Sequence, residues 1–363
     1  RPTTRSLRLE PFASFGFAPG LSKELNPGPE SAKAMQVGAV VSGTVVKDKA
    51  QFLASGSYEV LDLPSASPWA FDTARVGGVS APLAATIAQF ATDSFSYDAG
   101  RYTKPALRTY RGGSGNLQAD WQLSRIHRIT TRAAGARHTE QRPEFGLDLL
   151  NGADGRLESK DFLGSVSLTS TWSAIANEFR VGYQSATRDW KDAGVSTTYF
   201  VAEEAGIGAS PALPGNFERK ALQFQESFQY QFGSAGQARL KAGMSYATGT
   251  WTQDYLNGQK GIFDFGDLDH FGSGAGVFTQ VSASRTDVSF PLRQIGFFTH
   301  FSYDFSPALS GIIGLRWDRL KFADDKLVRD TAFVTAFGIR NDVAPSDKNF
   351  SPRLGLTWRQ GTG

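Results

Sequence analysis

The side chains best suited to chemistry in this sequence are four histidines and one short acidic segment. The histidines are His127, His138, His270 and His300, and the chain has no cysteine. A nucleophile and its base must converge in space, and nothing in the sequence groups these histidines. Each is therefore interpreted as a polar wall, turn or loop residue. The sequence predicts no catalytic residue, no cofactor and no enzyme activity.

The acidic segment FDFGDLDHF carries Asp264, Asp267 and Asp269 beside His270. Closely spaced carboxylates can hold Ca²⁺ through their oxygen atoms. The spacing does not match the twelve-residue loop of an EF-hand, so we predict a solvated stretch without a metal. Whether the loop 255–290 binds a cation is left open by the sequence.

Composition excludes several further classes of function. The net charge is only +3, which gives no reason to expect a nucleic-acid partner. The glycine-rich piece FGSGAG (271–276) follows no strand-to-helix pattern, so it is not a phosphate-binding loop. No stretch approaches the roughly 18 apolar residues of a membrane helix. Abundant Phe and Gly with only 2 Met favour β structure.

The elements that must position these residues alternate apolar and polar side chains with a period of two. Every second residue from Phe350 to Trp358 is apolar in FSPRLGLTWRQ (350–360), and the same holds in LQFQESFQYQF (222–232) apart from Glu226. Such segments are strands with one apolar and one polar face. A soluble sandwich would turn the apolar face inward, whereas a membrane barrel would turn it toward lipid.

The connections between the strands separate these two readings. Five hairpins are predicted, with short turns at 47–49, 124–127, 173–177, 233–237 and 306–308. A strand at 6–17 precedes them and 350–360 follows, which gives about twelve strands. The other connections are long: 18–34, 62–111, 140–157, 190–218, 255–290 and 323–348. Short turns at one end and long loops at the other are typical of an outer-membrane barrel.

The polar faces support the membrane barrel, because they carry Gln, Ser, Thr, Gly and Arg rather than the Lys and Glu of a soluble surface. Aromatic residues gather near the predicted strand ends, as in membrane girdles: Trp121, Trp172, Tyr230, Phe232, Phe305 and Trp317. We therefore predict an all-β transmembrane barrel. A large soluble β protein is the alternative.

This reading assigns individual side chains to the two faces. Leu315, Trp317, Leu354 and Leu356 should face lipid, and Arg316, Arg353 and Thr357 the lumen. Glu226 falls on the lipid face. At ~3.3 Å per residue and a tilt of ~40° it should lie roughly 18 Å above its turn, near the outer rim of the apolar band.

One helix is predicted, in the longest loop, by SAPLAATIAQFATDSF (80–95). Ser80 can cap it, and Leu83, Ile87 and Phe90 share a face. We expect this face to pack against neighbouring loops; a lid or a substrate contact is the alternative.

Four segments together resemble a known family. QVGAVVSGTVVKDKAQFLASGSYE (36–59), LQADWQLSRIHRITTRAAG (117–135), IGFFTHFSYDFSPALSGIIGLRWDRLKF (295–322) and FSPRLGLTWRQG (350–361) occur in the expected order. They are similar to the barrels of TonB-dependent receptors of the Oar-like group, whose members carry an N-terminal carboxypeptidase-regulatory-like domain.

The resemblance implies a 22-stranded barrel in the outer membrane of a Gram-negative bacterium, with an N-terminal plug inside. Residues 1–363 would then form part of one transmembrane barrel domain, without the plug and the C-terminal strands. The implied partners are outer-membrane lipid and lipopolysaccharide, an extracellular ligand or protein, and a periplasmic TonB-type coupling protein acting through a segment outside this chain.

The implied function is energy-coupled binding and uptake of an unidentified ligand. Two other functions fit the same residues. One is a structural or adhesive barrel whose loops hold a partner protein. The other is a complete, passive pore of twelve strands. The sequence alone does not separate them, because the plug and the coupling segment would decide between them.

Overall fold

The fold is taken from a computed structural model of the chain. It describes residues 7–18, 32–65, 81–96, 106–141, 155–192, 198–201, 205–208, 215–233, 236–255, 258–281, 287–322, 327, 329–343 and 346–359. None of the helices in these ranges is long and apolar enough to cross a bilayer.

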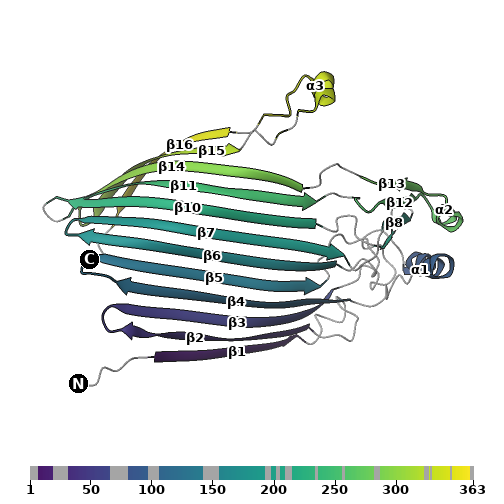
Figure 1. Ribbon diagram of the computed structural model, residues 1–363, viewed down its shortest axis with the longest axis horizontal. Helices are drawn as coiled ribbons and strands as arrows, with labels where there is room; N and C mark the ends of the chain where they lie inside the picture. The colour runs from purple at the N-terminus through teal and green to yellow at the C-terminus, as the bar shows by residue number, and fades with distance from the viewer. Residues whose placement is uncertain are drawn as a thin grey trace.

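Twelve antiparallel strands form one continuous sheet, in which every strand pairs with the next along the sheet (Figure 1). In spatial order they are β1 (Leu7–Ala18), β2 (Ala32–Val46), β3 (Ala50–Ser65), β4 (Ala106–Gln122), β5 (His127–Gln141), β6 (Gly155–Trp172), β7 (Ile175–Asp192), β10 (Gly215–Phe232), β11 (Ala238–Tyr255), β14 (Asp287–Ser306), β15 (Leu309–Phe322) and β16 (Ser346–Trp358). The predicted number of strands is confirmed.

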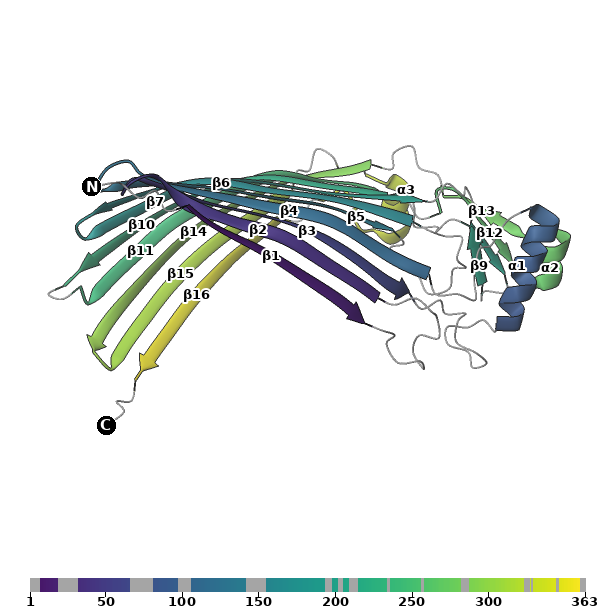
Figure 2. The same cartoon turned by 90° about the horizontal axis from the view of Figure 1, so that it is seen from below.

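The sheet is curved and open, and β1 and β16 are its two edges (Figure 2). In the described part of the chain no second layer covers either face. Of the buried hydrophobic residues, only Ala238 belongs to this sheet. A wall that buries no core of its own must meet other matter on both sides, which excludes the soluble sandwich.

The turns and loops are sorted as predicted, with the short turns at one end of the strands and the long connections at the other (Figure 1). Asp48 and Ser173 take positive φ angles of 58° and 43° in two of the turns. Three predicted turns include residues of the neighbouring strands. The turn 124–127 includes His127 of β5, and 306–308 includes Ser306 of β14. The turn 173–177 was too long by three residues. The strand β7 already begins at Ile175, so Ser173 and Ala174 alone form that turn.

The assignment of the two faces is confirmed by exposure and by register. Leu354 and Leu356 are 87% and 72% exposed. On β15, Leu354 lies opposite the outward residue Ile313 and Leu356 lies opposite Gly311. Trp317 is half-buried because it stacks on Phe297 with ring centroids 5.9 Å apart. On the opposite face Arg316 binds Asp318.

Glu226 lies on the apolar face, as predicted, opposite Phe179 and Met244. Its predicted place at the outer rim of the apolar band was wrong. Phe224 and Leu222 lie beyond it on the same face, so Glu226 is inside the apolar band and not at its rim. Its carboxylate accepts a hydrogen bond from the amide of Asn177 on the neighbouring strand. This bond lowers the cost of placing a carboxylate there.

A lobe at the long-loop end was not predicted. A second sheet has the order β13 (Val277–Thr279), β12 (Ile262–Phe265), β8 (Thr198–Val201) and β9 (Ala205–Gly208). Its central pair, β8 and β12, is parallel and joins two different loops. The helices α1 (Ala81–Phe95) and α2 (Leu268–Ser273) lie beside it (Figure 2). A third helix, α3 (Thr331–Phe337), lies in the last long connection.

The lobe holds nearly all of the buried core in the described residues. Ile87, Val201 and Phe271 are fully buried, and Phe265 is 3% exposed. Phe271 touches Phe90 of α1 and Phe265 of β12, at 5.1 Å between centroids in both cases. The predicted helix and its packing against another loop are therefore confirmed. Ser80 and the side chain of Leu83 lie outside the described residues.

Candidate functional site

The concave face of the large sheet carries paired charges. Asp120 accepts hydrogen bonds from Arg128 (2.7 Å), Thr130 (2.6 Å) and Gln118 (2.8 Å). Similar pairs join Arg188 to Asp161 at 2.9 Å and Arg239 to Asp304 at 2.7 Å. Because these carboxylates already bind cations, none is a free general acid or base. These pairs make this part of the wall a polar, charge-balanced surface suited to contact.

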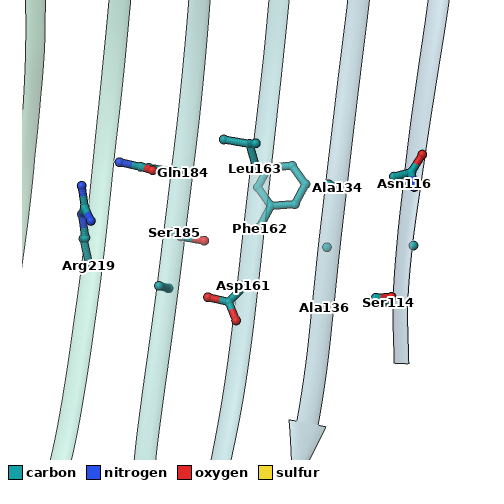
Figure 3. Close-up of a pocket in the computed structure, with 13 residues that line it drawn as sticks. Ser114, Asn116, Ala134, Ala136, Asp161, Phe162, Leu163, Gln184, Ser185 and Arg219 are labelled. Carbon is teal, nitrogen blue, oxygen red and sulfur yellow. The ribbon is translucent and has the colours of Figure 1, made fainter. Parts of the chain in front are cut away.

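A shallow hollow of about 530 Å³ lies on this wall, spanning β4 to β10 (Figure 3). It is lined by small residues such as Ser114, Ala134 and Ala136, and it is bordered by Asp161 and Arg219. Leu163 points into it and is 54% exposed. Small side chains keep the wall thin here, so another body can approach the backbone closely.

Aromatic residues gather on the same face toward the long-loop end. The register places Phe217, Trp251 and Phe290 on three adjacent strands at neighbouring positions. Phe217 packs edge-on against Trp251 at 5.6 Å, and the Arg219 guanidinium lies 5.9 Å from the centre of the Trp251 ring. Trp251 and Phe290 are 45% and 40% exposed. This group, which we call the mouth cluster, offers aromatic and cationic contacts to a ligand entering from the loop end.

Sequence reasoning missed the mouth cluster, although the signal was present. On β11 the outward residues are even-numbered, as in Leu240 and Met244, so Trp251 must face inward. The position of Trp251 in the alternation of β11 could therefore have identified it as an inward-facing residue. The pairing of Trp251 with Phe217 and Phe290 could not have been found without the strand register.

The four histidines are not brought together. His127 binds the hydroxyl of Ser170 at 2.8 Å, and His138 stacks on Tyr110 at 5.0 Å. His300 borders a separate hollow beside Asp304, and His270 lies in α2. No cluster of three possible metal ligands occurs in the described ranges.

The carboxylates of the acidic segment and His270 are exposed, as predicted, but the segment has a regular structure that was not predicted. It forms β12 and the start of α2, with Phe265 and Phe271 buried. Asp267 caps α2 by accepting from the backbone N–H of His270 at 2.7 Å, and it also contacts the His270 ring at 2.6 Å. The hydrogen bond from the His270 backbone N–H, together with the contact to the His270 ring, lowers the pKa of Asp267 below its usual value.

A pH dependence of α2 follows from this cap. A carboxyl whose pKa is lowered by folding stabilises the fold above its unfolded pKa of about 3.9, and this contribution is lost as the pH falls through the folded value. We expect hydrogen exchange in 268–273, corrected for its intrinsic pH dependence, to speed up below about pH 4. Asp267→Asn retains a capping acceptor but does not titrate, so its exchange should change less. Equal responses of both proteins would show that the cap does not depend on this charge.

The geometry defines the class of protein. On β6 the outward residues from Phe162 to Trp172 are mostly apolar, and the same span separates Leu222 from Phe232 on β10. Ten residues at ~3.3 Å, tilted by ~40°, rise about 25 Å, which is the height of the apolar band of outer-membrane barrels. An apolar outer band, a polar inner wall, short turns and long loops together describe the wall of an outer-membrane β-barrel.

The family follows from sequence comparison. The family model described as "TonB dependent receptor-like, beta-barrel" matches residues 57–361, and the chain belongs to this family. It is a family of receptors and transporters, not of enzymes, and its place is the outer membrane of Gram-negative bacteria. No curated protein matches the chain in sequence.

Solved structures share the fold. The ferripyoverdine receptor of the outer membrane of Pseudomonas aeruginosa aligns with a TM-score of 0.58 and 11% identity, over 99% of this chain and 41% of its own. The siderophore receptor PirA from Acinetobacter baumannii aligns with a TM-score of 0.55 and 12% identity, over 100% of this chain and 42% of its own. The outer membrane transporter YddB from Escherichia coli aligns with a TM-score of 0.56 and 10% identity, over 91% of this chain and 36% of its own. The chain thus spans only about two fifths of these proteins.

Proposed function

We propose that the intact protein is a TonB-dependent outer-membrane receptor that binds a ligand from outside the cell and imports it. Residues 1–363 form part of its single barrel domain, and the plug and further strands lie outside this chain. The coupling protein of the periplasm acts through a segment that also lies outside. Membership of the Oar-like group remains part of this proposal.

The observation that carries the proposal is the uncovered polar face of an open sheet. Twelve strands form the described wall, and its edge strands β1 and β16 do not pair with each other. An open edge is not tolerated in lipid, so other strands must complete the barrel. Barrel width grows with strand number, and only a wide barrel has room for a plug. The open edges weigh against the passive pore of twelve strands.

The ligand would meet the mouth cluster and the lobe. Exposed aromatic rings next to Arg219 suit a ligand with planar or anionic groups. Among the similar structures, one holds ferripyoverdine and another is a siderophore receptor. A metal chelate of this kind is the first ligand class to test. A pyocin complex in a further similar structure keeps a protein ligand as the second candidate.

The test is uptake of iron-55 loaded onto a panel of hydroxamate and catecholate siderophores. Cells with the intact protein should accumulate at least one of these chelates, and cells without the gene should not. Deleting the coupling protein should abolish uptake but leave binding at the surface.

Other outcomes distinguish the alternatives. Uptake that survives loss of the coupling protein would indicate a passive pore. Surface binding of a protein, without uptake of any chelate in either strain, would indicate a barrel that holds a partner.

A further inference from the structure

Four exposed cations form a patch on the apolar side of the wall, at its border with the long-loop end. They are Arg293 of β14, Arg319 and Lys321 of β15, and Lys348 of β16, and we call them the border patch. Arg293 follows Ile295 on its face, Arg319 follows Trp317, and Lys348 follows Phe350. On each of the three strands the first residue above the apolar band is therefore a cation.

The strand register places these cations against one another. Arg293 lies directly opposite Lys321, and Arg319 lies directly opposite Lys348. Directly opposed side chains have Cβ atoms about 5 Å apart, and like charges at this spacing destabilise a sheet. The wall therefore carries two unfavourable pairs at one place.

Three other cations on the same face have carboxylate partners. Arg111 pairs with Asp62 at 2.5 Å, Lys220 pairs with Glu218 at 2.6 Å, and Lys191 lies 3.5 Å from Glu158. Within the described ranges no carboxylate forms an ion pair with any cation of the border patch. The nearby Asp318 is turned to the other face, where it binds Arg316. The missing negative charge must therefore come from outside the described wall.

The position of the patch indicates the source of that charge. Arg319 lies two residues beyond Trp317, so at ~3.3 Å per residue and ~40° of tilt it is about 5 Å above the apolar band. This is the height of lipid headgroups. At the long-loop end these headgroups belong to the outer leaflet, which consists of lipopolysaccharide with phosphates on its glucosamine headgroup.

We propose that the border patch binds the phosphorylated headgroup of one lipopolysaccharide molecule. The phosphates lie between the two cation pairs and relieve their repulsion, while the acyl chains run down over Ile295, Trp317 and Phe350. Arginine suits this role because its planar guanidinium can bind phosphate with two hydrogen bonds. The inference uses the membrane orientation of the wall and does not require transport.

The experiment compares the intact protein with Arg319→Gln/Lys348→Gln, both refolded in detergent free of lipopolysaccharide. Binding of fluorescent lipopolysaccharide should weaken roughly tenfold to thirtyfold in the variant. The matched control is Lys47→Gln/Lys49→Gln, which removes the same charge from a short turn at the other end and should bind as the wild type does. Dephosphorylated lipopolysaccharide should bind both proteins equally weakly.

Stability gives a second readout that also guards against misfolding. Without lipopolysaccharide the variant should be at least as heat-stable as the wild type, because a like-charge pair is gone. Added lipopolysaccharide should raise the melting temperature of the wild type more than that of the variant. Equal binding by variant and wild type, or equal loss in the control, would overturn the proposal. Competition by millimolar inorganic phosphate alone would show a site for free anions and would overturn it as well.

Discussion

Replacing Val166 with arginine is expected to destabilise the protein in a bilayer by about 2–4 kcal/mol. Val166 is an outward residue of β6, 48% exposed, with no protein packed over it. It lies six residues from Trp172, which at ~3.3 Å per residue and ~40° of tilt places it about 15 Å into a band of about 25 Å. An arginine there would have no water and no partner. The measurement is the urea midpoint of reversible folding into phospholipid vesicles.

The matched control is Gln184→Arg on the adjacent strand β7. Gln184 lies opposite Leu163 and Ala221 on the inner face, where it borders the hollow of Figure 3. An arginine at this position meets the lumen, so it should cost far less than the one at position 166. If the two variants lose the same stability, or if Gln184→Arg loses more, the assignment of the faces is wrong.

Phe271→Ala is expected to destabilise the lobe by about 3–5 kcal/mol while leaving the barrel wall folded. Phe271 is fully buried, and its ring joins α1 to β12 through Phe90 and Phe265. Removing it opens a cavity where the described residues of the two loops share a core. Hydrogen exchange in 81–95 and 262–279 should become much faster, whereas β4 to β7 should remain protected.

Phe337→Ala provides the comparison, because Phe337 also lies in a loop helix but is 65% exposed. Its removal should change stability by well under 1 kcal/mol. Unchanged exchange in the lobe of the Phe271 variant would mean that the lobe does not fold as a unit.

The strands could be predicted because each carries its own signal. Alternation in 222–232 fixes both the strand and its two faces, and the short turn after Phe232 fixes its partner. The single-layer wall followed from the sorting of turn and loop lengths. These features depend on residues that are close together in the sequence, so they can be predicted without knowing the three-dimensional structure.

The lobe could not be predicted, for a physical reason. The strands β8 and β12 are only four residues each, and they pair in parallel across 60 residues of intervening chain (202–261). Four residues carry too little alternation to identify a strand, and a parallel pair leaves no turn signal. The capping role of Asp267 was hidden for the same reason, because the helix it caps has only six residues.

The most direct test of the account asks which solvent each face of β6 meets. The chain has no cysteine, so single cysteines can be placed at each position from 162 to 170 and spin-labelled. In vesicles, the label should be accessible to oxygen dissolved in lipid at even positions and to a water-soluble nickel complex at odd positions. The account predicts two profiles of period two that are out of phase. Profiles that rise and fall together, or even positions reached by the nickel complex, would contradict the claim that this face lies in the membrane.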